Sequence, residues 1–182
     1  EKVAQARERI AEAAAAAGRR PEDITLVAAT KMNDADRVRA AIAAGVDVCG
    51  ENRVQELLEK YEQHAYDGCP LHFIGTLQTN KVKYLIGKVS LIESVSSLKL
   101  ARVIDKEAAK AGIRQDILLE VNIGREESKL GIDPDELFSV TEQIAELEHV
   151  RVRGLMAIPP KPQPNQEKTL YFRKDFVYYK KE

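Results

Sequence analysis

The sequence predicts an α/β fold of the (β/α)8 TIM-barrel type, with six β/α units after an N-terminal helix. Short uncharged runs alternate six times with amphipathic runs, which requires parallel strands joined by right-handed crossovers. Polar or glycine residues follow nearly every expected strand, as in a barrel, whose mouth collects loops from all of its strands. An open doubly wound sheet is the alternative. The length of 182 residues favours it, because a complete barrel typically needs about 250 residues.

The elements follow in order along the chain. Apolar residues at helical spacing predict a first helix over residues 1–18. Residues 24–30 carry no charge, which is typical of a strand buried on both faces, and Asn33 or Asp34 can cap the next helix. Asp133 is the expected cap of a later helix, with Pro134 at its first position. The other expected strands are 46–50, 71–75, 89–95, 116–123 and 150–157, and the other helices lie near 52–64, 79–86, 97–111 and from 167.

Composition excludes several classes of function. The 28 Lys and Arg against 29 Asp and Glu give a net charge of −1, with no overall attraction for nucleic acid or an anionic membrane. No apolar run approaches the roughly 20 residues that span a bilayer. Cys49 and Cys69 form no CxxC pair, and the three histidines are scattered, so we expect no disulfide framework and no metal site. We expect one domain, residues 1–182, in the reducing cytoplasm.

Lys31 is the most informative single residue, because it follows seven uncharged strand residues directly. In a dry barrel mouth, desolvation would lower the pKa of its amine, and a neutral amine attacks carbonyl groups. The alternative is a solvated loop lysine at the strand end, which is the more frequent case for this spacing alone.

Other candidates also follow expected strands. The turn Gly50-Glu51-Asn52 can place the Asn52 amide and the Glu51 carboxylate on one face of the sheet, although an ordinary helix cap is the commoner role of such an asparagine. The loop after residue 123 contains Ser128 and Lys129, which together with backbone amides can hold a phosphate. Most loops of this kind are merely solvated.

Five blocks in order resemble the pyridoxal phosphate homeostasis protein family, a group of small proteins similar to the barrel domain of alanine racemase. Together the blocks extend over essentially the whole sequence. They are Ala29-Thr30-Lys31, Gly50-Glu51-Asn52-Arg53-Val54-Gln55-Glu56, His72 to Lys81, Val121 to Gly131, and Arg153-Gly154-Leu155-Met156-Ala157-Ile158.

The resemblance implies a barrel of the type III fold of pyridoxal 5′-phosphate (PLP) proteins, with PLP held as a Schiff base on Lys31. Asn52 and Met156 would line the cofactor, and Lys129 would match a loop lysine that binds PLP secondarily. In the family, a serine- and glycine-rich turn holds the phosphate and an arginine-glycine segment faces the pyridine nitrogen. Neither segment occurs in this sequence, so we expect the barrel to be incomplete at its C-terminus.

The function that the resemblance implies is intracellular PLP homeostasis, in which PLP is stored and released to acceptors such as PLP-dependent apo-enzymes. The protein would then be a carrier and not an enzyme. An amino-acid racemase is one alternative, but racemisation needs acid/base groups on both faces of the substrate, and Lys31 supplies one. A cofactor-free Schiff-base aldolase barrel is the other.

Overall fold

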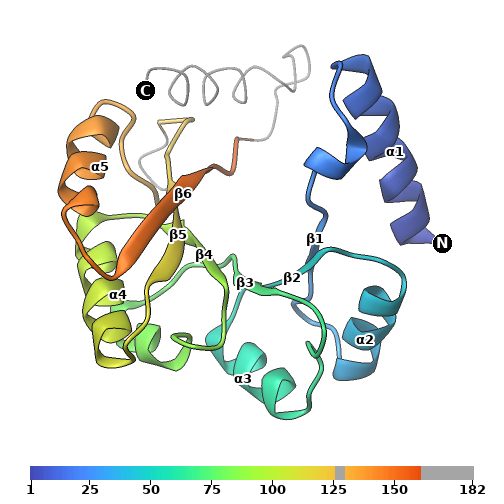
Figure 1. Ribbon diagram of the computed structural model, residues 1–182, viewed down its shortest axis with the longest axis horizontal. Helices are drawn as coiled ribbons and strands as arrows, with labels where there is room; N and C mark the ends of the chain where they lie inside the picture. The colour runs from blue at the N-terminus through green and yellow to red at the C-terminus, as the bar shows by residue number, and fades with distance from the viewer. Residues whose placement is uncertain (126–129, 161–182) are drawn as a thin grey trace. The chain divides into compact units, whose positions relative to one another are not determined.

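The computed structural model describes residues 1–125 and 130–160, which fall into two compact units, Glu1–Ile74 and Gly75–Glu182. In both, short parallel strands alternate with helices, as the sequence predicts (Figure 1). No helix in the described residues has the length and apolarity of a membrane span. The expected helix from residue 167 lies outside the described residues.

The first unit contains a parallel sheet in the order β1-β2-β3. Ala29 of β1 pairs with Gly50 of β2, and Glu51 of β2 pairs with Phe73 of β3. The helices α2 and α3 both contact β2 and bury Val38 and Leu57. The elements are α1 (Lys2–Ala16), η1 (Pro21–Asp23), β1 (Val27–Ala29), α2 (Ala35–Ala43), β2 (Val48–Glu51), α3 (Val54–Glu62) and β3 (Leu71–Phe73).

The first strand is shorter and more exposed than the sequence suggests. Residues 24–30 were expected to be a strand buried on both faces, but β1 contains only Val27–Ala29 and none of these residues is fully buried. In this sheet β1 hydrogen-bonds to β2 alone, so its apolar side chains are less covered than those of β2, where all four residues are buried. The expected cap of the next helix is confirmed, since the Asp34 carboxylate accepts the Arg37 N–H at 2.8 Å.

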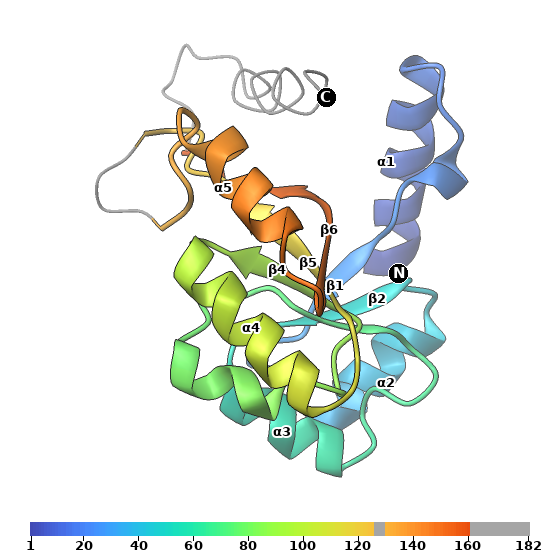
Figure 2. The same cartoon turned by 60° about the vertical axis from the view of Figure 1, so that its left-hand side comes forward.

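The second unit contains the parallel strands β4, β5 and β6, with β5 paired to both neighbours. The helices α4 and α5 contact each other and lie side by side in both views (Figures 1 and 2). Their buried residues Ile104 and Ile144 face an apolar sheet that includes Ile117. The elements are η2 (Thr79–Tyr84), β4 (Leu91–Val95), α4 (Leu98–Lys110), β5 (Gln115–Glu120), α5 (Leu137–Ala145) and β6 (Val150–Met156).

Two helix predictions in this unit are wrong in detail. The segment expected as a helix over 79–86 contains a 3-10 helix over Thr79–Tyr84, and its buried Val82 lies three residues before the buried Leu85, which caps it. Asp133 does not cap α5, which begins at Leu137. Its carboxylate instead accepts the Asp135 N–H at 2.8 Å, and Asp135 pairs with Arg125, so these acids stabilise a turn before the helix.

Candidate functional site

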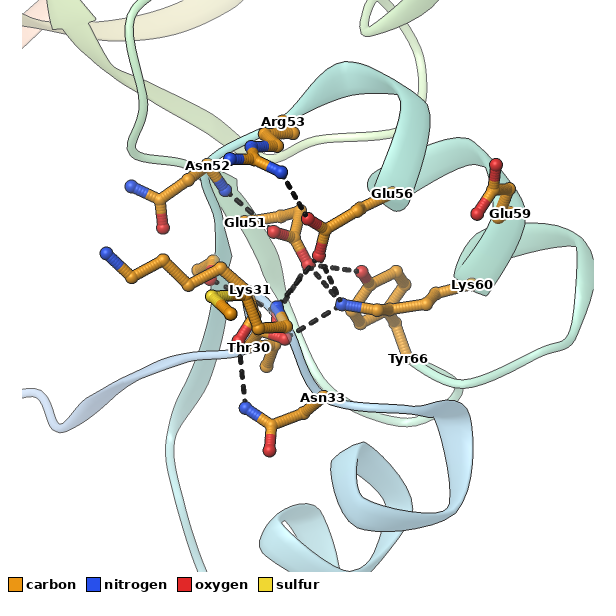
Figure 3. Close-up of polar contacts among 12 residues, drawn as sticks. Thr30, Lys31, Asn33, Glu51, Asn52, Arg53, Glu56, Glu59, Lys60 and Tyr66 are labelled. Atoms are coloured by element: carbon orange, nitrogen blue, oxygen red, sulfur yellow. Dashed lines mark hydrogen bonds and ion pairs between the residues drawn. The ribbon is translucent and has the colours of Figure 1, made fainter.

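The carboxyl edge of the β1-β2-β3 sheet brings Lys31 and Asn52 together. Thr30 N–H donates to Gly50 O at 2.8 Å, which continues the register of Ala29 with Gly50 past the end of β1. Lys31 lies two residues after Ala29, and Asn52 lies two residues after Gly50. The two residues therefore follow the ends of β1 and β2 at the same level of the sheet. Figure 3 shows both side chains directed away from the buried residues beneath them.

Lys31 itself is exposed, so the dry surroundings expected for its amine are absent from the described part of the chain. The reason is its position: the buried Thr30 follows the end of β1, and the chain leaves the sheet at Lys31. The next residue, Met32, takes a left-handed φ of 59°, a conformation that needs support from its surroundings in a residue other than glycine.

Asn52 does not cap the helix α3, although its position in the sequence suggested that role. The helix α3 begins at Val54 with Arg53 as its cap, so Asn52 is not the helix cap. Its Oδ1 atom is buried, and no donor in the described residues reaches it. A buried acceptor without a donor is costly, and a bound molecule with a hydrogen-bond donor would satisfy it.

A buried polar cluster lies behind Lys31 and is formed by Thr30, Glu51, Glu56, Lys60 and Tyr66. Glu51 has no exposed surface, and its Oε2 accepts from Lys60 Nζ at 2.8 Å, Thr30 Oγ1 at 3.0 Å and Tyr66 Oη at 3.3 Å. Burial and the nearby Glu51 carboxylate raise the pKa of the Tyr66 phenol, which keeps it a neutral donor.

The cluster decides which nearby lysine is available for chemistry. Lys60 is only 6% exposed, and its Nζ donates to Thr30 O, Glu51 Oε2 and Glu56 Oε2. These contacts use all three donors of an ammonium group. Lys60 is therefore a structural cation, while the exposed Lys31 amine can meet an external carbonyl group (Figure 3).

Sequence reasoning placed Glu51 and Asn52 on one face, but the structure separates their roles. Glu51 turns into the buried cluster, whereas Asn52 is half-buried at the edge. Lys60 and Tyr66 were missed. The signal for Lys60 was its place three residues after Leu57 on the apolar face of α3, where a lysine needs a buried partner.

The other two predicted site residues belong to the second unit. Met156 is the last residue of β6 in the second unit, half-buried and paired with Glu120. Lys129 lies outside the described residues. No group of three or more metal-ligating His, Cys, Asp or Glu side chains occurs in residues 1–125 and 130–160.

Comparison with known proteins identifies the family. Residues 3–176 match the family model of the alanine racemase N-terminal domain. A pyridoxal phosphate homeostasis protein of Aquifex aeolicus is 45% identical over 174 residues, which are 96% of this chain and 76% of the relative. The chain belongs to the pyridoxal phosphate homeostasis protein family.

Solved structures agree with this membership of the homeostasis protein family. PipY of Synechococcus elongatus with PLP bound is 32% identical, with a TM-score of 0.78 over 93% of this chain and 79% of that one. A protein of unknown function from Bifidobacterium adolescentis is 36% identical, with a TM-score of 0.87 over 98% of this chain and 75% of that one. Together with the racemase-domain match, they confirm the predicted TIM-barrel type of α/β fold.

Proposed function

We propose that this chain binds PLP for PLP homeostasis and holds it through a Schiff-base linkage to Lys31. The observation that supports this most directly is the pairing of an exposed lysine with a partnerless Asn52 acceptor at one strand edge. The relatives are named as homeostasis proteins, and the PipY structure has PLP bound.

The bound group would supply an aldehyde carbon. The Lys31 amine would be the group that bonds to this carbon, with loss of one water molecule for each C=N bond formed. Water or another amine reverses the reaction, so the linkage stores the aldehyde without consuming it. An exposed lysine suits such exchange, because acceptor amines can reach it from solvent.

Several finer features belong to the same proposal. Met156 would line the cofactor and Lys129 would bind it secondarily, within a single barrel domain that extends through residues 1–182. Cytoplasmic PLP-dependent apo-enzymes would be the acceptors. We propose a carrier and not an enzyme, because Lys31 offers an acid/base group on one face only.

Titration with PLP tests the proposal. We expect wild-type protein to develop a visible absorbance band that is lost in Lys31→Ala and retained in Lys99→Ala, which removes an exposed lysine of α4. An equal band in the Lys31→Ala variant would contradict the proposal. Enzyme-like conversion of L-alanine to D-alanine would indicate a racemase instead, and covalent trapping of a keto-sugar without PLP would indicate an aldolase.

A further inference from the structure

Lys60 contacts the residue before Lys31 directly and the residue after it through Glu56. Its Nζ donates to Thr30 O at 2.8 Å, immediately before Lys31. It also lies 3.2 Å from Glu56 Oε2, and that oxygen accepts the N–H of Met32, immediately after Lys31, at 2.9 Å. The two peptide groups next to Lys31 are therefore tied to one ammonium group, directly or through one carboxylate (Figure 3).

Glu51 extends the same hold to Asn52. Its Oε2 accepts from Lys60 and from Thr30 Oγ1, while its Oε1 accepts the Asn52 N–H at 2.9 Å. The two strand ends that carry the proposed PLP-binding residues thus share one buried ion pair. Glu56, which Lys60 also contacts, accepts the N–H of the left-handed Met32, and a strained turn persists only where its surroundings fix it.

Stability alone is a poor explanation for this arrangement. Glu51 has no exposed surface and Lys60 is 6% exposed, so both lose their hydration on folding. Replacing a buried ion pair with apolar residues of similar volume is often neutral or stabilising. A buried pair whose hydrogen bonds reach the ends of both β1 and β2 is better explained by the geometry of those two strand ends.

We propose that Lys60 and Glu51, with Glu56, are positioning residues that present the Lys31 amine to PLP beside Asn52. This inference rests on the proposed function. The three side chains fix the backbone of the turn and leave the Lys31 side chain free to react. Small displacements of a reacting group are costly, because about 1 Å can lower a rate by about a hundredfold.

The first test is the double variant Glu51→Gln/Lys60→Met, which removes both charges of the buried pair and leaves Glu56 within 3.6 Å of Arg53. Its matched control is Glu107→Gln/Lys110→Met, which removes a glutamate-lysine pair of α4 at 2.7 Å whose lysine is exposed. After mixing with PLP, we expect the cluster variant to develop the visible band about tenfold more slowly, and the control to match wild type. Lys60→Arg keeps the cation and should restore most of the rate.

A second pair of variants tests the same inference with a substitution that should not prevent folding. Glu56 is 21% exposed, so Glu56→Ala should fold while freeing the Met32 N–H. Glu59→Ala, on the same helix and exposed, is its control. We expect slower PLP capture and faster hydrogen exchange of the Met32 amide in Glu56→Ala alone, with an unchanged cooperative melting curve in both.

The outcomes separate the inference from the proposed function. If wild type captures PLP on Lys31 and the folded cluster variants do so at the same rate, the positioning role is overturned. If wild type does not react at Lys31, the proposed function fails. Hydrogen exchange of the Met32 amide then still tests whether Glu56 fixes the backbone of the turn. An unchanged exchange rate of the Met32 amide in Glu56→Ala would show that Glu56 does not fix this backbone.

Discussion

At the scale of single residues, burial makes chemically similar side chains behave differently. Lys31 and Lys60 lie close to the same strand end, but one is exposed and the other has every donor engaged. The two cysteines offer a parallel case. Burial raises the pKa of the Cys49 thiol to about 12, with a further contribution from Cys69, whose sulfur lies 3.7 Å away.

Cys49 should therefore resist alkylation in the folded protein. Only the thiolate reacts with iodoacetamide, and near pH 8 a thiol with so high a pKa is almost entirely protonated. We expect the half-buried Cys69 to be modified first, and Cys49 only after unfolding in urea. Peptide mass analysis after timed alkylation checks this order. Equal modification of both cysteines in native protein would contradict it.

Lys31 could be predicted as a site residue because a charged residue directly after an uncharged strand is evident from the sequence alone. The buried partners of its turn could not be predicted, because Lys60 and Tyr66 meet Glu51 only through the packing of α3 and the loop after it on β2. The sequence left the exposure of Lys31 open as the alternative to a dry barrel mouth, since exposure depends on where the chain leaves the sheet.

At the scale of elements, helix starts and strand ends account for most differences between expectation and structure. The order of strands and helices follows from hydrophobic periodicity, which the sequence displays directly. The start of α5 does not follow from this periodicity. Asp133 accepts the Asp135 N–H in a turn before the helix, and both carboxylates pair with Arg125. A local capping pattern cannot reveal a distant cationic partner.

Gly131 provides a test of local backbone geometry near that turn. It has a φ of +127°, and a Cβ there would lie 2.7 Å from the Asn122 backbone nitrogen. Gly131→Ala should lower the free energy of unfolding by about 3 kcal/mol, from backbone strain and steric overlap together.

The matched control is Gly112→Ala. Gly112 has a φ of +66° with nothing within 4 Å of an added Cβ, so we expect a loss of only about 1 kcal/mol. Urea unfolding measures both values. Equal losses would show that the close approach to Asn122 contributes nothing.

Glu120, the last residue of β5, tests the electrostatics of a strand end. Burial raises the pKa of its carboxyl above the ordinary 4.5. Above pH 4.5 the unfolded chain therefore loses this proton more readily than the folded chain, and the free energy of unfolding falls as pH rises to the raised pKa.

Glu120→Gln removes this dependence. At pH 7 we expect the variant to gain about 0.5–1 kcal/mol, the size of many single stabilising substitutions. At pH 4, where the wild-type carboxyl is largely protonated in both states, the gain should nearly vanish. Urea unfolding at the two pH values provides the comparison. A variant less stable than wild type at pH 7 would show that the carboxylate has a favourable partner.

At the scale of the whole molecule, the family resemblance predicted more than the physical pattern did. Alternation left two architectures open, since the chain length favoured the open sheet and the polar or glycine residues after the strands favoured the barrel. The ordered blocks added support for the barrel, and the racemase-domain match and solved structures confirm the barrel type. Met156 was assigned to the site from the resemblance alone, because no pattern within one strand links it to Lys31, and its role stays a prediction.

The central claim is that Lys31 is the residue that bonds to PLP. The most direct measurement is borohydride reduction of the PLP-treated protein, followed by peptide mass analysis of every lysine. We predict one pyridoxyl group per chain, on the peptide that contains Lys31, and none on Lys60. A pyridoxyl group on another lysine with Lys31 unmodified, or no fixed group at all, would contradict the claim.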